Sequence, residues 1–167
     1  MAQHGESLPR AARRVAEALS ARGHAGEIRI LSDSARSAAE AAAALGVAQE
    51  QIVKSMVFRG RSSGQAILAL VGGRSRVDTE LLAAFAGEGV ARADADWVRE
   101  QTGFAIGGVP PVGHAEQLRT FADSSLVEFE LLWAAAGTPH AVFPMRGDEL
   151  EALTGAALAP IASAGGG

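Results

Sequence analysis

The sequence has no cysteine and only one lysine, and each shortage limits the kinds of functional site that the chain can form. Without cysteine there is no disulfide, no thiolate metal site and no cysteine nucleophile, which is typical of a reducing compartment. No apolar run approaches the roughly 20 residues that cross a bilayer, and residues 1–9 lack the apolar core of a signal peptide. We therefore expect a cytoplasmic protein with no membrane partner.

Histidine is scarce as well, and several catalytic motifs are missing. The spacing of the four histidines matches no common metal motif, so we expect no metal ion and no cofactor. The chain also lacks a G-x-G-x-x-G sequence after a strand, a phosphate-binding loop with a lysine, and a G-x-S-x-G elbow. The histidines are His4, His24, His114 and His140.

Net charge is −4, which argues against indiscriminate binding to nucleic acid and against DNA as a partner. The charge is unevenly spread, because residues 52–77 hold five cationic side chains and no acidic one. An anionic ligand would find its most favourable field in this segment, although such basic turns are often simply solvated. The five cations are Lys54, Arg59, Arg61, Arg74 and Arg76.

Length and composition indicate one globular domain, since the chain has 167 residues, 48% apolar and 20% charged. Capping residues and apolar periodicity predict helices at 11–21, from a Ser34 or Ser37 cap to 45, at 80–86, around 97–98, and at 148–154. Strand patterns fall at 27–31, 52–59, 65–71, 90–93, 104–106, 118–122, 127–129, 141–143 and 158–161.

Helices and strands alternate, but several connections are too short for parallel crossovers. We therefore expect an α+β fold: a single domain over residues 10–162, with a mixed, mostly antiparallel and partly barrel-like sheet surrounded by helices. The termini, residues 1–9 and 163–167, are expected to be flexible, because they hold little to bury.

The single lysine, Lys54, stands among fourteen arginines, inside the apolar run 51–59. This run is rich in β-forming residues and predicts a strand with both faces largely covered. Lysine is rarely buried without a partner, and burial shifts the pKa of its amine. Lys54 is therefore a candidate functional amine, and the alternative is a solvated strand residue in an arginine-biased chain.

A second unusual segment is 103–114, Gly-Phe-Ala-Ile-Gly-Gly-Val-Pro-Pro-Val-Gly-His. The glycines and prolines exclude a helix or a central strand over 107–113. A rigid loop of this kind can aim backbone N–H groups at an oxyanion or a water, although such clusters often form ordinary tight connections. A third segment, 138–140, places His140 directly after a turn. From the sequence, this histidine could act as a base, as a hydrogen-bond donor to a ligand, or as a structural residue.

Together, these segments resemble the YbaK/EbsC and prolyl-tRNA synthetase editing-domain family, which includes free-standing aminoacyl-tRNA deacylases. The resemblance rests on Gln51-Ile52-Val53-Lys54-Ser55 and on the run from Gly107 to His114, with support from the segments 34–42 and 137–143. It extends from about residue 15 to residue 161. It implies hydrolysis of the ester between a wrong amino acid and tRNA, often tRNA for proline, with prolyl-tRNA synthetase as a possible partner.

The resemblance also implies roles for individual residues. Lys54 would engage the terminal phosphate or ribose and the carbonyl region, and the N–H groups of Gly107 and Gly108 would hold water or the developing oxyanion. Ser55 stands where alanine-specific relatives often have asparagine, and the resemblance implies that His140 is the counterpart of their pocket histidine. The expected substrate-binding set is Ser55, Pro111, Gly113, His114, His140, Arg59 and Arg76.

An activated ester needs positioning and charge stabilisation rather than a covalent nucleophile, so the residues are compatible with this chemistry. Two other functions stay open from the sequence. In one, Lys54 forms a Schiff base with a carbonyl substrate. In the other, the domain binds the tRNA end or a synthetase without hydrolysis.

Overall fold

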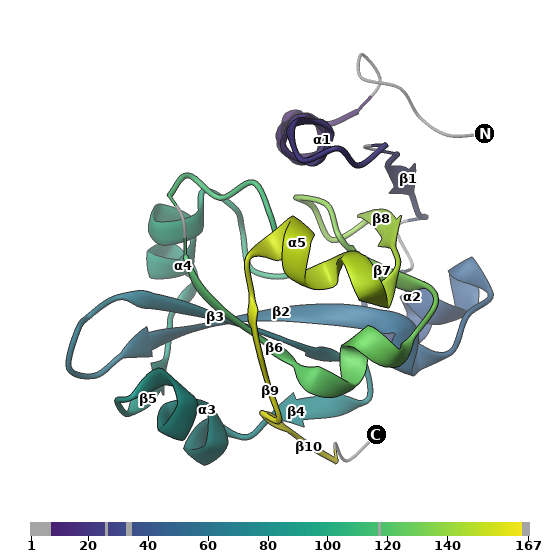
Figure 1. Cartoon of the computed structure of the whole chain (residues 1–167). Helices are drawn as coiled ribbons and strands as arrows, with labels where there is room; N and C mark the ends of the chain where they lie inside the picture. The colour runs from purple at the N-terminus through teal and green to yellow at the C-terminus, as the bar shows by residue number, and fades with distance from the viewer. Residues whose placement is uncertain (1–7, 26, 33–34, 117, 165–167) are drawn as a thin grey trace.

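The computed structural model describes residues 8–25, 27–32, 35–116 and 118–164, and the account below concerns these residues. Five α-helices lie around a mixed sheet (Figure 1). The helices are α1 (Arg10–Ala21), α2 (Ala38–Leu45), α3 (Thr79–Ala86), α4 (Ala95–Thr102) and α5 (Leu150–Thr154), and the short 3-10 helices are Gln49–Gln51, Ser124–Glu128 and Gly147–Glu149. The strands are β1 (Arg29–Ile30), β2 (Ile52–Gly60), β3 (Ala66–Gly72), β4 (Ser75–Val77), β5 (Val90–Arg92), β6 (Arg119–Asp123), β7 (Leu132–Ala135), β8 (Ala141–Met145), β9 (Ala157–Ala159) and β10 (Ala162–Ala164).

The main sheet has the order β1-β8-β7-β2-β3-β6-β9, and β5 also pairs with β2. The pairs β2–β7, β3–β6 and β6–β9 are parallel, and the remaining pairs are antiparallel, including β10–β4 in a separate small sheet. The predicted α+β class with a mixed, mostly antiparallel sheet is confirmed. The partly barrel-like shape is wrong, because β1 and β9 are the two ends of the order and do not pair with each other.

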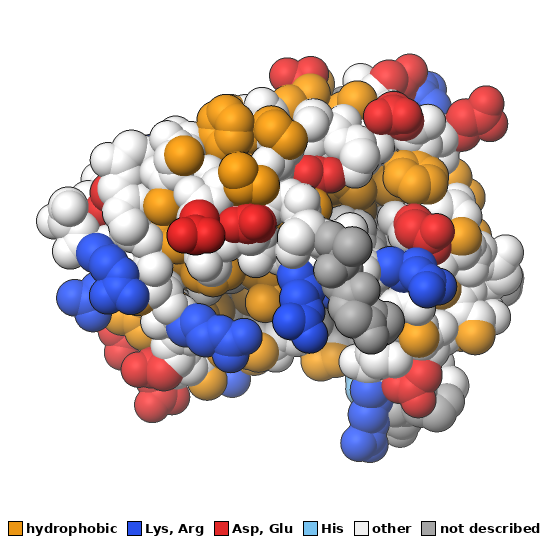
Figure 2. Space-filling model, turned by 90° about the horizontal axis from the view of Figure 1, so that it is seen from below, with side chains coloured by type: hydrophobic (Ala, Val, Ile, Leu, Met, Phe, Trp, Pro, Cys, Tyr) orange, Lys and Arg blue, Asp and Glu red, His pale blue; other side chains and the backbone are white. Residues whose placement is uncertain are grey.

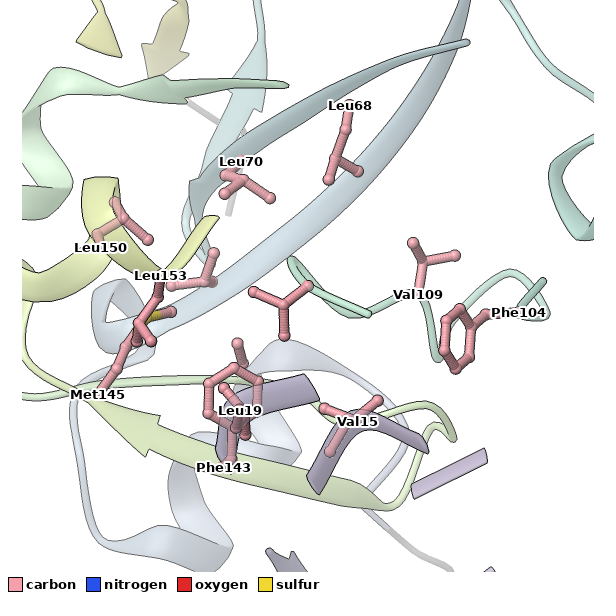
Figure 3. Close-up of a cluster of buried hydrophobic side chains, with 14 of the residues drawn as sticks. Val15, Leu19, Leu68, Leu70, Phe104, Val109, Phe143, Met145, Leu150 and Leu153 are labelled. Atoms are coloured by element: carbon pink, nitrogen blue, oxygen red, sulfur yellow. The ribbon is translucent and has the colours of Figure 1, made fainter. Parts of the chain in front are cut away.

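The central strand β3 shows why helices cover both faces of the sheet. Residues 66–71 are all buried, and successive side chains point to opposite faces. Leu68 and Leu70 join a core with α1 and α5 (Figure 3), whereas Ile67 and Val71 join a second core that includes Leu82 of α3. The β-branched and leucine-rich run therefore forms a strand between two apolar layers.

Several predicted elements are confirmed. Ser37 caps α2, Asp78 caps α3 and Asp94 caps α4, each through its side-chain oxygen. The hairpin of β2 and β3 also matches the sequence prediction. Of the predicted flexible termini, residues 1–7 and 165–167 lie outside the described residues, whereas Ser163 lies in β10.

Two predicted strands are wrong. Residues 104–106 form no strand and belong to a loop, and residues 127–129 fall in and after the 3-10 helix Ser124–Glu128. Three strands were not predicted: β7, which is alanine-rich, β4, which begins inside a Gly-Arg-Ser turn sequence, and β10, which follows the last predicted strand. No helix among the described residues has both the length and the hydropathy needed to cross a membrane.

Candidate functional site

A cleft of about 880 Å³ runs along β2. One wall, which we call the strand wall, consists of residues 52–58 of β2. The opposite wall, which we call the loop wall, contains Ile106, Gly107 and Val109. The start of α2, strand β4 and the ends of β5 and β7 also contribute to the lining, together with single residues of β3, α3, α4 and β8 and with Pro139. All three segments singled out in the sequence therefore contribute to the same cleft, the third through Pro139 alone.

Lys54 lies on the strand wall and is half-buried. Its Nζ donates a hydrogen bond to the backbone oxygen of Ser75 on β4 at 2.6 Å, which leaves two of its three N–H donors available. Burial, followed by the nearby charge of Arg76, lowers the pKa of Lys54 below its usual 10.5. The prediction that both faces of this strand are largely covered is wrong over its middle, since residues 54–57 are half-buried or exposed and Met56 is 40% exposed.

The described charged side chains that line the cleft all carry a charge of the same sign. Among the described residues that line it, four are cationic and none is acidic. Figure 2 shows a row of Lys and Arg side chains on the face seen from below, with hydrophobic side chains among them. A low-dielectric cleft with charges of one sign favours an anionic ligand. The four cations are Arg36, Lys54, Arg76 and Arg92.

On the loop wall, Gly107 is exposed and has a φ of +92°, a conformation that strains any residue with a Cβ. Its N–H has no hydrogen-bond acceptor among the described residues. Gly108 differs, because it is buried and its N–H donates to the oxygen of Ala105 at 3.0 Å. The structure therefore leaves the Gly107 N–H available for a ligand and commits the Gly108 N–H to a turn.

Gly108 instead supports the loop. Its oxygen accepts a hydrogen bond from the N–H of Gly137 at 3.0 Å. A Cβ at position 108 would lie 2.7 Å from the Cα of Thr138, so no other residue has room there. The apolar side chains of Phe104 and Val109 anchor the two ends of the loop in the main core (Figure 3).

Pro111, Gly113 and His114 lie behind the loop and do not line the cleft. Pro111 is buried, and Gly113 has a φ of +84° where the chain passes close to α1. The Nε2 of His114 lies 2.6 Å from the backbone oxygen of Pro110. Burial lowers the pKa of His114 below its usual 6.5. These three residues therefore lie outside the cleft lining, and their contacts are with neighbouring parts of the protein.

Two further predicted site residues are also outside the cleft lining. Arg59 is exposed at the far end of β2, where that strand pairs with β5. His140 is half-buried, and its backbone oxygen accepts a hydrogen bond from the N–H of Leu31 at 2.7 Å, while its neighbour Pro139 lines the cleft.

The structure therefore brings together Lys54, Ser55, Gly107 and Arg76 from the predicted set. It adds Arg36 and Arg92, which sequence reasoning missed, because no local pattern indicates that an arginine 18 or 38 residues away from Lys54 lines the same cleft. No described residue lining the cleft is Asp, Glu or His, and no three such side chains form a metal-type group among the described residues.

The fold and the cleft define a class of protein: a single α+β domain whose cleft is lined by one amine, three arginines and a glycine-containing loop. A family model described as the aminoacyl-tRNA editing domain matches residues 32–153, and the chain belongs to this family. This confirms the family resemblance seen in the sequence.

Individual relatives agree with this assignment. A crystal structure of a protein proposed as a trans-editing enzyme for prolyl tRNA synthetase superposes with a TM-score of 0.89 at 46% identity, over 94% of this chain and 99% of that one. The uncharacterized protein YwhH of Bacillus subtilis (strain 168) is 32% identical over 66% of this chain and 70% of its own. The proline–tRNA ligase of Thermosipho africanus (strain TCF52B) is 34% identical over 57% of this chain, which spans only 17% of that enzyme.

Proposed function

We propose that this protein is a trans-editing hydrolase that removes a wrong, small amino acid from tRNA, with tRNA for proline as the expected acceptor. The observation that carries the proposal is Lys54, a half-buried amine in a cleft whose described lining has four cations and no acid. The tRNA end is anionic, and its aminoacyl ester develops further negative charge during hydrolysis.

In the proposed reaction, water attacks the ester carbonyl, and the bond between the carbonyl carbon and the ribose oxygen breaks. The products are a free amino acid and a tRNA with a restored hydroxyl group, which takes up a proton from the water. The two available N–H donors of Lys54 and the N–H of Gly107 stabilise the negative oxygen. Arg76 neutralises backbone phosphate, and no covalent intermediate is needed.

The similarity to part of a proline–tRNA ligase supports a link with the proline system, with prolyl-tRNA synthetase as a possible partner. We expect such a protein to act in the cytoplasm, where aminoacyl-tRNA is made and used. The net charge of −4 fits this proposed function, because a net negative charge weakens general affinity for RNA. Weak general affinity would keep the protein from binding and hydrolysing correctly charged tRNA.

The test is deacylation of alanyl-, cysteinyl-, seryl- and threonyl-tRNA, each on a proline and a non-proline tRNA, by wild-type and Lys54→Ala protein. We expect turnover of at least one small amino acid, and a rate loss of about 10²–10³ in the variant. Arg59→Ala is the matched control, because Arg59 is a cation of the same strand outside the cleft. A folded Lys54→Ala protein as fast as wild type would exclude the catalytic role of the amine, and binding without turnover across the panel would favour a non-catalytic module.

The lowered pKa of Lys54 also favours a second candidate function, in which the neutral amine attacks a carbonyl compound and forms a Schiff base with loss of water. Borohydride reduction in the presence of substrate, followed by mass spectrometry, separates the two candidates. We expect no adduct on Lys54, whereas a trapped adduct would support the Schiff-base enzyme.

A further inference from the structure

The strand β2 has one edge that is only partly paired. The other edge of β2, which we call the first edge, is paired with β3 from Val53 to Arg59. On its second edge, β7 pairs with residues 52–53 and β5 pairs with residues 58–60. No strand among the described residues pairs with this second edge at residues 54–57. A short stretch of open sheet edge therefore lies between the ends of two neighbouring strands.

The hydrogen bonds of the hairpin show which backbone groups face this opening. The N–H of Gly60 donates to the oxygen of Gln65 at 2.9 Å, on the β3 side, and the register to Val53 is continuous. The backbone N–H and C=O groups of successive residues point alternately to the two edges of a strand. Those of residues 54, 56 and 58 therefore point toward β3, like those of Gly60. Ser55 and Val57 therefore direct their N–H and C=O groups toward the open edge.

This open edge lies inside the cleft, since Ser55 and Val57 line it together with Ala135 at the end of β7 and Ala93 just after β5. The hydroxyl oxygen of Ser55 gives a second, independent observation at this edge. It is buried and has no hydrogen-bond partner among the described residues. Buried polar groups are nearly always hydrogen-bonded, so an unpaired hydroxyl beside an unpaired strand edge indicates a binding site.

We propose that this edge binds the base of the 3′-terminal adenosine of the substrate through its Watson–Crick side, an inference that rests on the proposed function. The C=O of Ser55 and the N–H of Val57 are adjacent on the open edge and form an acceptor–donor pair. The amino group on C6 of adenine donates to Ser55, and N1 of adenine accepts from Val57.

The chemistry of the pair selects a base over other parts of the substrate. A phosphate only accepts hydrogen bonds and an ammonium group only donates them, whereas a nucleobase edge does both. The four cations of the lining favour a ligand with phosphates over a neutral peptide strand. Met56 and Ile106, which are 40% and 54% exposed, offer apolar surface for the faces of the base. Lys54, the neighbour of Ser55, is then close to the ribose that carries the ester.

The first test uses tRNA with an altered 3′-terminal nucleoside and measures KM and kcat of wild-type protein. Purine riboside lacks the amino group and 1-deazaadenosine lacks N1, and we expect each to raise KM about three- to tenfold, the value of one lost hydrogen bond. The control is 7-deazaadenosine, which keeps both groups and should behave as adenosine. Equal KM values for all four ends would overturn the inference and leave the proposed function intact.

The second test needs no hydrolysis. Adenosine 5′-monophosphate is titrated into ¹⁵N-labelled protein, and we expect the amide signal of Val57 to shift strongly. Purine riboside 5′-monophosphate should shift it less. If the protein proves inactive on all aminoacyl-tRNAs but Val57 responds to adenosine 5′-monophosphate, the nucleotide site stands and the proposed function fails. A Val57 amide that does not move while other cleft amides shift would overturn the inference, as would a response only to strand-forming peptides.

Discussion

The strand wall and the loop wall of the cleft hold their residues by different means. The strand wall is fixed by backbone ladders, with β3 along one edge and β7 and β5 at the two ends of the other. The loop wall has no ladder and depends on close contacts behind it: Gly108 against residues 137–138, and His114 at the oxygen of Pro110.

This difference separates two kinds of contribution to the site. On the strand wall, Lys54 and Ser55 bring chemical groups, and β3 pairing keeps them in register. On the loop wall, Gly107 brings a backbone N–H, and its position depends on every contact that shapes the loop. Changes on the strand wall should therefore affect charge and binding, whereas changes behind the loop wall should act through geometry.

The largest effect that separates the walls is expected from Gly107→Ala. A Cβ at a φ of +92° costs about 1–2 kcal/mol, and relief of this strain would move the N–H away from the substrate. We expect deacylation to fall on the order of 10²-fold, with circular dichroism unchanged. Gly64→Ala is the matched control, because Gly64 has a φ of +71°, open space around it and a place in the hairpin turn outside the cleft. An active Gly107→Ala enzyme would remove Gly107 from the oxyanion site.

A smaller effect is expected on the side of the strand wall, from the arginines. Arg76→Ala should raise KM for aminoacyl-tRNA about three- to tenfold, since Arg76 lines the cleft beside Lys54. The slope of log KM against log salt should become shallower by about one. Arg59→Ala should change neither quantity, and an equal effect of both variants would mean that the basic surface acts as a whole.

The smallest effect concerns stability behind the loop wall. Because burial lowers the pKa of His114, the unfolded chain binds more protons than the folded chain just below pH 6.5. The stability that depends on neutral His114 is fully present above pH 6.5 and is lost as pH falls through the lowered pKa. Urea unfolding at about pH 7.5 and pH 5.5 should show a larger loss for wild type than for His114→Gln. Equal losses would show that protonation of His114 is not the cause.

Much of the strand wall was predictable from sequence, because the β-rich run at 51–59, the turn and the following apolar run together define a hairpin. The lone lysine also stood out by residue type. The open edge was not predictable, since it depends on where β7 and β5 end, and β7 is alanine-rich in a chain where alanine is common everywhere.

The loop wall was predictable only as a loop. Its glycines and prolines excluded regular structure, but the sequence does not reveal which N–H group is already used in a turn. Gly107 and Gly108 are identical residues side by side, and only the folded structure distinguishes them, through the φ of Gly107, the turn hydrogen bond of Gly108 and the close approach of Thr138 to Gly108. Arg36 and Arg92 were missed for a similar reason, because tertiary packing alone brings them to the cleft that Lys54 lines.

The most direct test of the account is the state of Lys54 itself. As the only lysine in the chain, it gives a single signal in protein labelled with ¹³C at the lysine Cε. We predict a pKa below 10.5 and a clear shift of this signal on addition of an aminoacyl-adenosine analogue with an amide in place of the ester. A Lys54 signal that titrates at 10.5 and does not move with saturating analogue would contradict the central claim that this amine meets the substrate.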